Sequence, residues 1–207
     1  MSTLIVADHP LLSHALTILR DKTTTTVEFR QRAAIVSQIL LVEATRRLKL
    51  HPRHVETPLA PYDGAELDGK VIVVPVLRAG LAMLLAVQDM LPSVAVGFVG
   101  LERDEKTAIA HEYYQKIPPI TPGHHVFVLD PMLATGGSLD DTVSILHGKG
   151  CRGITLVCIV AAPEGIARIQ QRYPDATIIT AAIDQRLNAQ KFIVPGLGDF
   201  GDRFFGT

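Results

Sequence analysis

Residues 124–146, HHVFVLDPMLATGGSLDDTVSIL, have the composition of a phosphate-binding loop. An apolar segment ends at Asp130, and small and hydroxyl-bearing residues fill 135–138, where a helix is expected to begin. Backbone N–H groups at a helix N-terminus lack partners within the helix and attract anions. Glycines let a ligand approach the backbone, and an aspartate at a strand tip can accept hydrogen bonds from ribose hydroxyls. The run predicts a site for a phosphorylated sugar. The alternative is an ordinary strand-to-helix turn capped by Ser138.

A second strand-to-turn signal surrounds Arg78, in the run VPVLRAGL at residues 74–81. Its apolar half predicts a strand, and the turn that follows carries a permanently charged guanidinium. In open parallel sheets, ligands bind at the carboxyl ends of the strands, so Arg78 and Asp130 are expected at one sheet edge. A guanidinium fork beside backbone N–H groups suits a second phosphate or a diphosphate. The alternative is a surface arginine with no ligand.

Three other patterns lack the context that their chemistry needs. Residues 196–201 spell G-x-G-x-x-G, but only six residues follow, too few for a dinucleotide-binding unit. The histidine pairs have no supporting Cys or carboxylate spacing, so no protein-only metal site is expected. Ser138 has no His or second acid at a motif-like spacing, and we do not interpret it as a nucleophile. Asp140 and Asp141 are expected as surface acids in the first turn of a helix.

The elements that would position these residues alternate between strands and helices. Continuous apolar strands separated by helices are typical of a largely parallel sheet covered on both faces. The sequence therefore predicts a single α/β domain over residues 1–207. Strands are expected at 71–76, 94–99, 126–129, 154–160 and 177–181, with helices at 11–20, 27–48, 81–90, 139–150 and 163–173.

Three segments do not fit this alternation. Residues 49–68 are rich in Pro, His and Gly without periodicity, which predicts a loop or an irregular strand. Residues 101–123 form a polar insertion, and its charges favour a lid over a binding hairpin or disorder. Residues 184–207 keep several large apolar side chains among their glycines, so this tail is expected to pack on the domain.

Composition excludes several classes of protein. The 207 residues carry 20 Lys plus Arg against 21 Asp plus Glu, so bulk charge would not hold the chain on nucleic acid or on an anionic membrane. Arg78 lies within the only apolar stretch long enough to suggest a membrane span. Cys151 and Cys158 lie in or beside apolar runs, and no targeting segment is visible at the start. We expect a cytoplasmic protein with buried thiols.

Together, VLDPMLATGGS, VPVLRAGL and the tail IVPGLGDFGDRFFGT resemble the uracil phosphoribosyltransferase family. The likeness runs over nearly the whole chain and includes HPL at 9–11 and VAAPEG at 160–165. Phosphoribosyltransferases in general share only the strand, the acid and the phosphate loop. The PGLGD run at 195–199 is characteristic of the uracil enzymes. The resemblance implies a type I phosphoribosyltransferase fold with a lid at 101–123 and a base-binding tail at 184–207.

The resemblance also implies a site for 5-phosphoribosyl-1-diphosphate and a site for uracil. It assigns catalysis to the charged residues Asp130, Asp199, Arg78 and Arg103, with Arg103 arriving from the lid beside Lys106. The phosphoribosyl donor would be bound by Arg78, Arg103, Asp130, Pro131, Met132, Leu133, Ala134, Thr135, Gly136, Gly137, Ser138 and Asp199. Uracil would be bound by Ile193, Gly198, Asp199 and Phe200.

Further expectations follow from the resemblance. Mg²⁺ would bind mainly through the diphosphate, and the turn at 77–79 would contain a non-proline cis peptide. Similar enzymes are homodimers or larger assemblies, and some respond to GTP. The tail departs from the family pattern at Arg186, Lys191, Phe192 and Phe200, where Gly, Gly, Tyr and Ala are usual. A Phe200 side chain facing the pocket would narrow the base site, whereas recognition through its backbone would leave uracil room.

Two other functions remain open from the residues alone. An RNA-binding pyrimidine regulator on the same fold should show a basic face, but Lys and Arg are scattered along this chain. A relative that uses another base would be consistent with Phe192 and Phe200. Fold alone does not separate these functions.

Overall fold

The computed structural model describes residues 3–68, 70–103 and 110–207, and its centre is a mostly parallel sheet. The strand order is β1-β11-β10-β8-β4-β6-β7, with β5 beside β4 and β9 beside β10. The predicted α/β class is confirmed. The strands of this sheet are β1 (Thr3–Val6), β4 (Val71–Leu77), β5 (Ala95–Val96), β6 (Phe98–Arg103), β7 (Ala110–Lys116), β8 (His125–Leu129), β9 (Met132–Leu133), β10 (Gly153–Ala161) and β11 (Thr177–Ile183).

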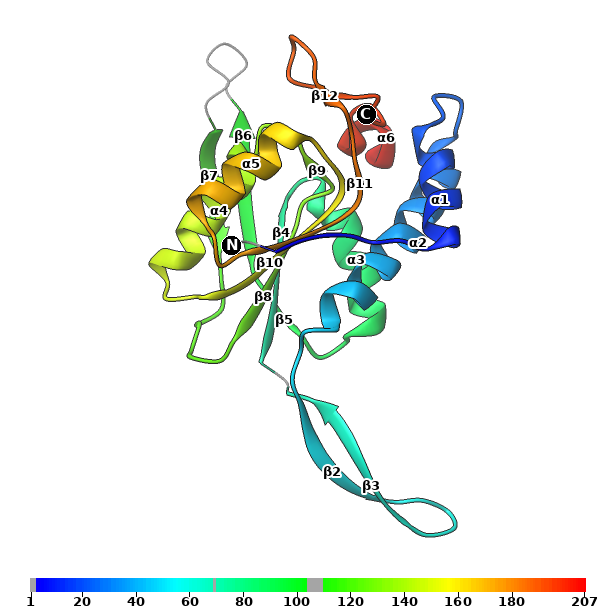
Figure 1. Cartoon of the computed structure of the whole chain (residues 1–207), viewed down its shortest axis with the longest axis vertical. Coiled ribbons are helices and arrows are strands. Elements are labelled where there is room, and N and C mark those ends of the chain that lie inside the picture. Colours follow the sequence, from blue (N-terminus) through cyan, green and yellow to red (C-terminus); the bar gives the residue numbers. More distant parts are fainter. Residues whose placement is uncertain (1–2, 69, 104–109) are drawn as a thin grey trace.

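Helices cover both faces of the sheet (Figure 1). Successive side chains of a strand point to opposite faces, and in β8 Phe127 joins one core while Val126 and Val128 join the other. Burial on both faces explains why the strands are continuously apolar. The first core contains side chains of α1 (Pro10–Arg20), α2 (Thr26–Thr45), α3 (Gly80–Met90) and α6 (Phe200–Phe205), and the second contains those of α4 (Gly137–Gly148) and α5 (Pro163–Arg172).

The first three strands of the chain differ from the sequence prediction. The chain opens on β1, not on a helix, and β1 pairs in parallel with β11 at the sheet edge. Residues predicted as loop or irregular strand form a regular antiparallel hairpin of β2 (Leu50–Glu56) and β3 (Pro61–Leu67), which projects away from the body in Figure 1. The hairpin is held by polar pairs between its two strands, where a strand of the main sheet has hydrophobic packing. His51 lies 2.8 Å from Glu66, and His54 lies 2.7 Å from Asp63. Such pairs leave no periodic apolar signal in the sequence.

Two strands occupy most of the described part of the predicted lid, and residues 117–123 follow them without regular structure. β6 and β7 pair antiparallel, with a register shift between Gly100 and Leu101. The hairpin extends the sheet at the carboxyl edge, and residues 104–109, which include Lys106, lie outside the described residues. Opening or closure of 101–123 therefore stays a prediction. In the described part of the chain, no helix combines the length and the apolar character of a membrane span.

Asp140 is a correction, because it is fully buried and not a surface acid. Its carboxylate accepts hydrogen bonds from Tyr173 Oη at 2.7 Å and Arg168 Nε at 2.8 Å, and it also pairs with Arg172. Burial opposes ionisation, but these hydrogen bonds and the two guanidinium charges outweigh it and hold the pKa of Asp140 below its usual range. The network ties the first turn of α4 to α5. It brings together residues about 30 positions apart, which no local pattern signals.

Replacing Tyr173 with Phe removes a neutral donor to a buried carboxylate while it keeps the ring. We expect the free energy of unfolding to fall by about 1.5–3 kcal/mol, the range for a hydrogen bond to a charged group. Urea denaturation measures it. Tyr62→Phe is the matched control, because Tyr62 is 60% exposed, and it should change stability by less than about 0.5 kcal/mol. Equal effects of the two variants would remove Tyr173 from the network.

Candidate active site

The parallel pairing of β4, β8 and β10 brings the two sequence signals to one edge of the sheet. Val71 of β4 aligns with His125 of β8, and the pairing continues to Pro75 and Leu129. Arg78 and Asp130 therefore both follow the carboxyl ends of neighbouring strands. The Leu77–Arg78 peptide bond is cis, as the resemblance implied. The arrangement is the usual location for a ligand site in an open parallel sheet.

The loop after Asp130 is held against β10. Asp130 Oδ1 accepts a hydrogen bond from the backbone N–H of Met132 at 3.5 Å. The Pro131 carbonyl accepts hydrogen bonds from the backbone N–H groups of Ile159 and Val160, at 2.9 and 3.0 Å. The short strand β9 then pairs with the end of β10. Backbone pairing on one side fixes the loop before any ligand binds, and a preformed loop loses little entropy on binding.

The loop after Asp130 ends at Gly136, which is the N-cap of α4 and has a left-handed φ of 78°. Glycine adopts this conformation without the steric cost that a side chain brings. The expectation that the helix begins near Ser138 is confirmed, but Ser138 lies within the first turn, and α4 has no side-chain cap. The alternative of a capping Ser138 is therefore wrong. The uncapped end leaves backbone N–H groups of the first turn available to an anion.

The tail returns to the same edge and is anchored to α1 by Arg20. The Arg20 guanidinium donates to Asp184 Oδ1 at 2.6 Å and Oδ2 at 2.8 Å, and to the Gly196 carbonyl at 2.7 Å. The Gly196 N–H in turn donates to Asp184 Oδ2 at 2.8 Å. Asp184 is buried, so this bidentate pair is shielded from water. Arg20 was not identified from sequence, because its partners are more than 160 residues away.

The turn at Gly196 needs a glycine for two reasons. Its φ is 62°, and a Cβ there would lie 2.2 Å from the Ile193 carbonyl oxygen. The preceding Val194–Pro195 bond is cis. The turn connects β13 (Ile193–Val194), which pairs antiparallel with β12 (Arg186–Leu187), to α6.

The side chain of Phe200 faces the core and not the cavity that lies between the sheet edge and the tail. It is 1% exposed, and its ring centroid lies 5.2 Å from that of Phe29 and 5.9 Å from that of Phe204. Its backbone remains at the cavity wall. Phe192 is 52% exposed at the cavity rim. The sequence left two expectations for Phe200: a ring that narrows the predicted base site, or a ring that leaves it room. The structure supports the second.

A cavity of about 350 Å³ joins the sheet edge to the tail. Asp199 stands on its tail side, where Oδ1 accepts the Asp202 N–H at 3.0 Å and caps α6. The volume falls within the range of small-molecule sites. The cavity is lined by Ala79, Leu101, Asp130, Met132, Ala134 and Ser138 from the sheet side and by Gln190, Lys191, Phe192, Ile193, Gly198, Asp199, Phe200 and Gly201 from the tail.

Several predicted site residues lie beside this cavity without lining it. Arg78 is mostly exposed at its edge, and its guanidinium lies 3.8 Å from the Asp202 carboxylate. Gly136 and Gly137 line a small adjoining hollow with Asp130. The backbone of Arg103 ends β6, and its side chain lies outside the described residues. Leu133 also lines that hollow, and Pro131 and Thr135 are neighbours of lining residues along the chain.

Comparison with known proteins places the chain near one family. The family model for uracil phosphoribosyltransferase matches residues 6–207. The uracil phosphoribosyltransferase of Finegoldia magna is 48% identical over 208 residues, which is 100% of each chain. That of Dictyoglomus thermophilum is 50% identical over 204 residues, 98% of this chain and 99% of the relative. A solved protein structure from Aquifex aeolicus is 33% identical, with a TM-score of 0.94 over 99% of each chain.

The two phenylalanines of the tail should respond differently to truncation. Phe200→Ala opens a hole among Phe29 and Phe204, and we expect the free energy of unfolding to fall by about 3–5 kcal/mol. Phe192→Ala removes a half-exposed ring, and stability should change by less than about 1 kcal/mol. Thermal and urea unfolding measure both. A small effect at Phe200 would mean that its ring does not belong to the core.

Proposed function

Because the chain belongs to the uracil phosphoribosyltransferase family, we propose that it transfers the phosphoribosyl group of 5-phosphoribosyl-1-diphosphate to N1 of uracil, giving UMP and diphosphate. One observation carries the proposal. A single cavity is lined on one side by the loop that starts at Asp130 and on the other by the tail around Asp199. A donor and an acceptor that bind opposite walls of one cavity can meet within it.

The donor side of the cavity supports binding of a phosphorylated ribose. The first turn of α4 presents backbone N–H groups and the Ser138 hydroxyl to a 5-phosphate. The Asp130 carboxylate, which lines the same wall, would accept hydrogen bonds from the ribose hydroxyls. Arg78, at the edge of the cavity, would meet the diphosphate with its guanidinium fork. We propose that Arg103 joins it from the end of β6.

The tail side supports recognition of a pyrimidine by main-chain groups. Uracil presents two carbonyl acceptors and an N3–H donor, which backbone N–H and C=O groups of Ile193 and of 198–200 would complement. Phe200 offers only its backbone, because its ring is buried. The departure from Ala at this position therefore leaves the proposed contacts intact. Lys191 and Phe192 line the outer part of the cavity, where they would flank the base.

The reaction needs alignment and charge stabilisation from the chain. Uracil N1 would attack ribose C1 while the bond from C1 to the diphosphate oxygen breaks, and the N1 proton would pass to the departing diphosphate or to water. Charge builds on the departing diphosphate, where the Arg78 guanidinium and the backbone dipoles would stabilise it. Asp199, on the base side, would polarise or stabilise the base. Asp130 would hold the ribose so that C1 faces the base.

The family resemblance also implies Mg²⁺, and the oxygen groups around the cavity suit a hard cation. Asp130 and Asp199 line the cavity from opposite walls. Across residues 3–68, 70–103 and 110–207, no three His, Cys, Asp or Glu side chains gather as a complete metal site. We propose that the diphosphate would supply most of the ligands, with Asp130 and Asp199 nearby. When bound, Mg²⁺ neutralises part of the diphosphate charge.

We further propose that the protein assembles as a homodimer or a larger homo-oligomer through the β2–β3 hairpin. The hairpin stands clear of the domain in Figure 1, and its tip carries Leu59, which is 97% exposed, while Leu50 and Tyr62 are also exposed. Exposed apolar side chains of this kind mark contact surfaces.

A response to GTP stays a prediction from the resemblance. A cytoplasmic location also stays a prediction, with which the buried free thiols of Cys151 and Cys158 are consistent.

A choice between uracil and cytosine tests the proposed function most simply. Cytosine replaces the N3 donor by an acceptor and one carbonyl acceptor by an amino group. Each mismatch leaves a buried polar group unpaired, and sites of this kind discriminate by roughly 10⁴–10⁵. We expect diphosphate release and UMP formation with uracil and no measurable CMP with cytosine. Comparable turnover of cytosine would contradict recognition by the main chain, and a preference for hypoxanthine would contradict the proposed function.

A further inference from the structure

A second and larger cavity opens at the opposite edge of the sheet. Its volume is about 720 Å³, and it lies at the amino ends of the central strands: Lys70 precedes β4, His125 begins β8 and Gly153 begins β10. The seven residues of β4 place it about 23 Å from Arg78, since a strand rises about 3.3 Å per residue. The proposed substrates of the transferase reaction lie at the other end of these strands, so this cavity has no role in that reaction.

The cavity is lined by more positive than negative charge. Arg47, Lys49, Lys70 and Arg152 line it with a single carboxylate, that of Asp68. Among the described residues, none of these four cations is in an ion pair, whereas Arg20, Arg168 and Arg172 elsewhere are. A concave surface focuses the field of such charges. The excess is notable in a chain whose net charge is −1.

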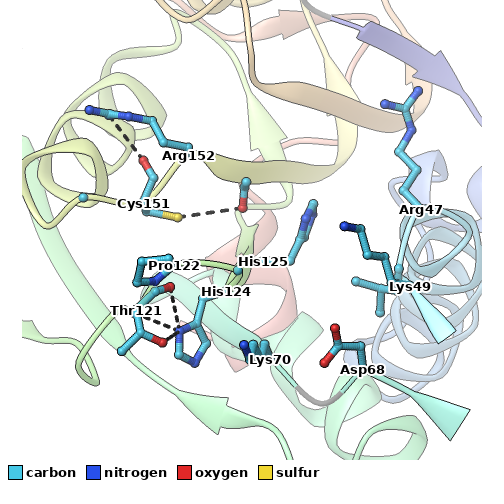
Figure 2. Close-up of a pocket in the computed structure, with 14 residues that line it drawn as sticks. Arg47, Lys49, Asp68, Lys70, Thr121, Pro122, His124, His125, Cys151 and Arg152 are labelled. Atoms are coloured by element: carbon cyan, nitrogen blue, oxygen red, sulfur yellow. Dashed lines mark hydrogen bonds between the residues drawn. The ribbon is translucent and has the colours of Figure 1, made fainter. Parts of the chain in front are cut away.

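The charged groups surround the cavity from separate segments. Figure 2 shows the Lys49 side chain reaching toward His125, with Lys70 and Asp68 below them in the view, while the side chains of Arg47 and Arg152 point away from this centre. Arg47 donates to Thr177 Oγ1 at 3.3 Å, which holds its guanidinium near the sheet edge. The ammonium ends of Lys49 and Lys70 have no such partner among the described residues, so both remain available to a ligand.

His125 and two glycines form the inner wall. His125 Nε2 lies 2.9 Å from Thr155 Oγ1, and a Cβ on Gly153 would lie 3.2 Å from His125 Nδ1. A Cβ on Gly123 would lie 3.5 Å from the Lys70 ammonium nitrogen. The small residues therefore leave the imidazole and the ammonium close to the surface of the cavity, where a compact anion would contact both.

We propose that this cavity, between Lys49, Lys70 and His125, is a second binding site that takes a small anion with two or more phosphate groups. The volume suits a small molecule. Ammonium groups bind phosphate as point charges, and the Arg47 and Arg152 charges at the edge of the cavity add to the positive field there. An extended nucleic acid fits less well, because Lys49 and Lys70 line one pocket and do not form a stripe along the surface.

The test uses tripolyphosphate as the probe and NMR of the His125 ring as the readout, with the signal assigned from a His125→Asn variant. This readout reports on the second cavity even if the probe also binds at the transferase site. We expect saturable shifts of the His125 signal. The variant Lys49→Gln/Lys70→Gln should weaken the apparent Kd at least about tenfold, because two charge-assisted contacts are lost.

A control of equal net charge distinguishes a site from general attraction. Lys22→Gln/Lys116→Gln removes two exposed lysines that do not line the cavity, and it should keep the wild-type Kd. Equal weakening in both double variants, or an unchanged His125 signal at about 10 mM tripolyphosphate, would overturn the proposal. So would citrate binding as tightly as tripolyphosphate. Fructose 1,6-bisphosphate identifies the source: tighter binding than tripolyphosphate supports a phosphorylated metabolite, and weaker binding supports a free polyphosphate.

Discussion

The parallel register of β4, β8 and β10 is the constraint on which the site depends. Because these strands run side by side in the same direction, the residues that follow them, Arg78 and Asp130, must emerge at one edge. Side chains buried on both faces fix this register, since a slip by one residue would exchange the two cores. The position of the loop after Asp130 is therefore set by apolar packing of the strands.

The tail forms one wall of the cavity, and hydrogen bonds from two arginine side chains hold the tail in this position. Arg20 contacts both oxygens of Asp184 and the Gly196 carbonyl, and Arg203 donates to the carbonyls of Leu197 and Asp21. The Phe200 ring then packs against α2 through Phe29. Ordering a glycine-rich tail costs conformational entropy, and these hydrogen bonds, together with the buried Phe200 ring, offset that cost. The base side of the cavity consequently depends on α1 and α2, at the other end of the chain.

Much of the fold was readable from the sequence, because the central strands and helices carry strong local periodicity. Local patterns also located the loop at Asp130 and the turn at Arg78. They could not show that Asp140 is buried, because its partners lie on α5, and a pair of acids at the start of a helix is normally solvated. Nor could they show which way Phe200 faces, since that depends on Phe29. The β2–β3 hairpin was missed because its cross-strand pairs are charged.

We propose that the carboxyl edge of the sheet, and not the larger cavity at the amino edge, holds the phosphoribosyl donor. Backbone amide NMR with ribose 5-phosphate measures this directly, because the amides of both edges report separately. We expect the largest shifts at Gly136, Gly137 and Ser138, at the start of α4. Shifts confined to the surroundings of Lys70 and His125, with none in the loop after Asp130, would contradict it.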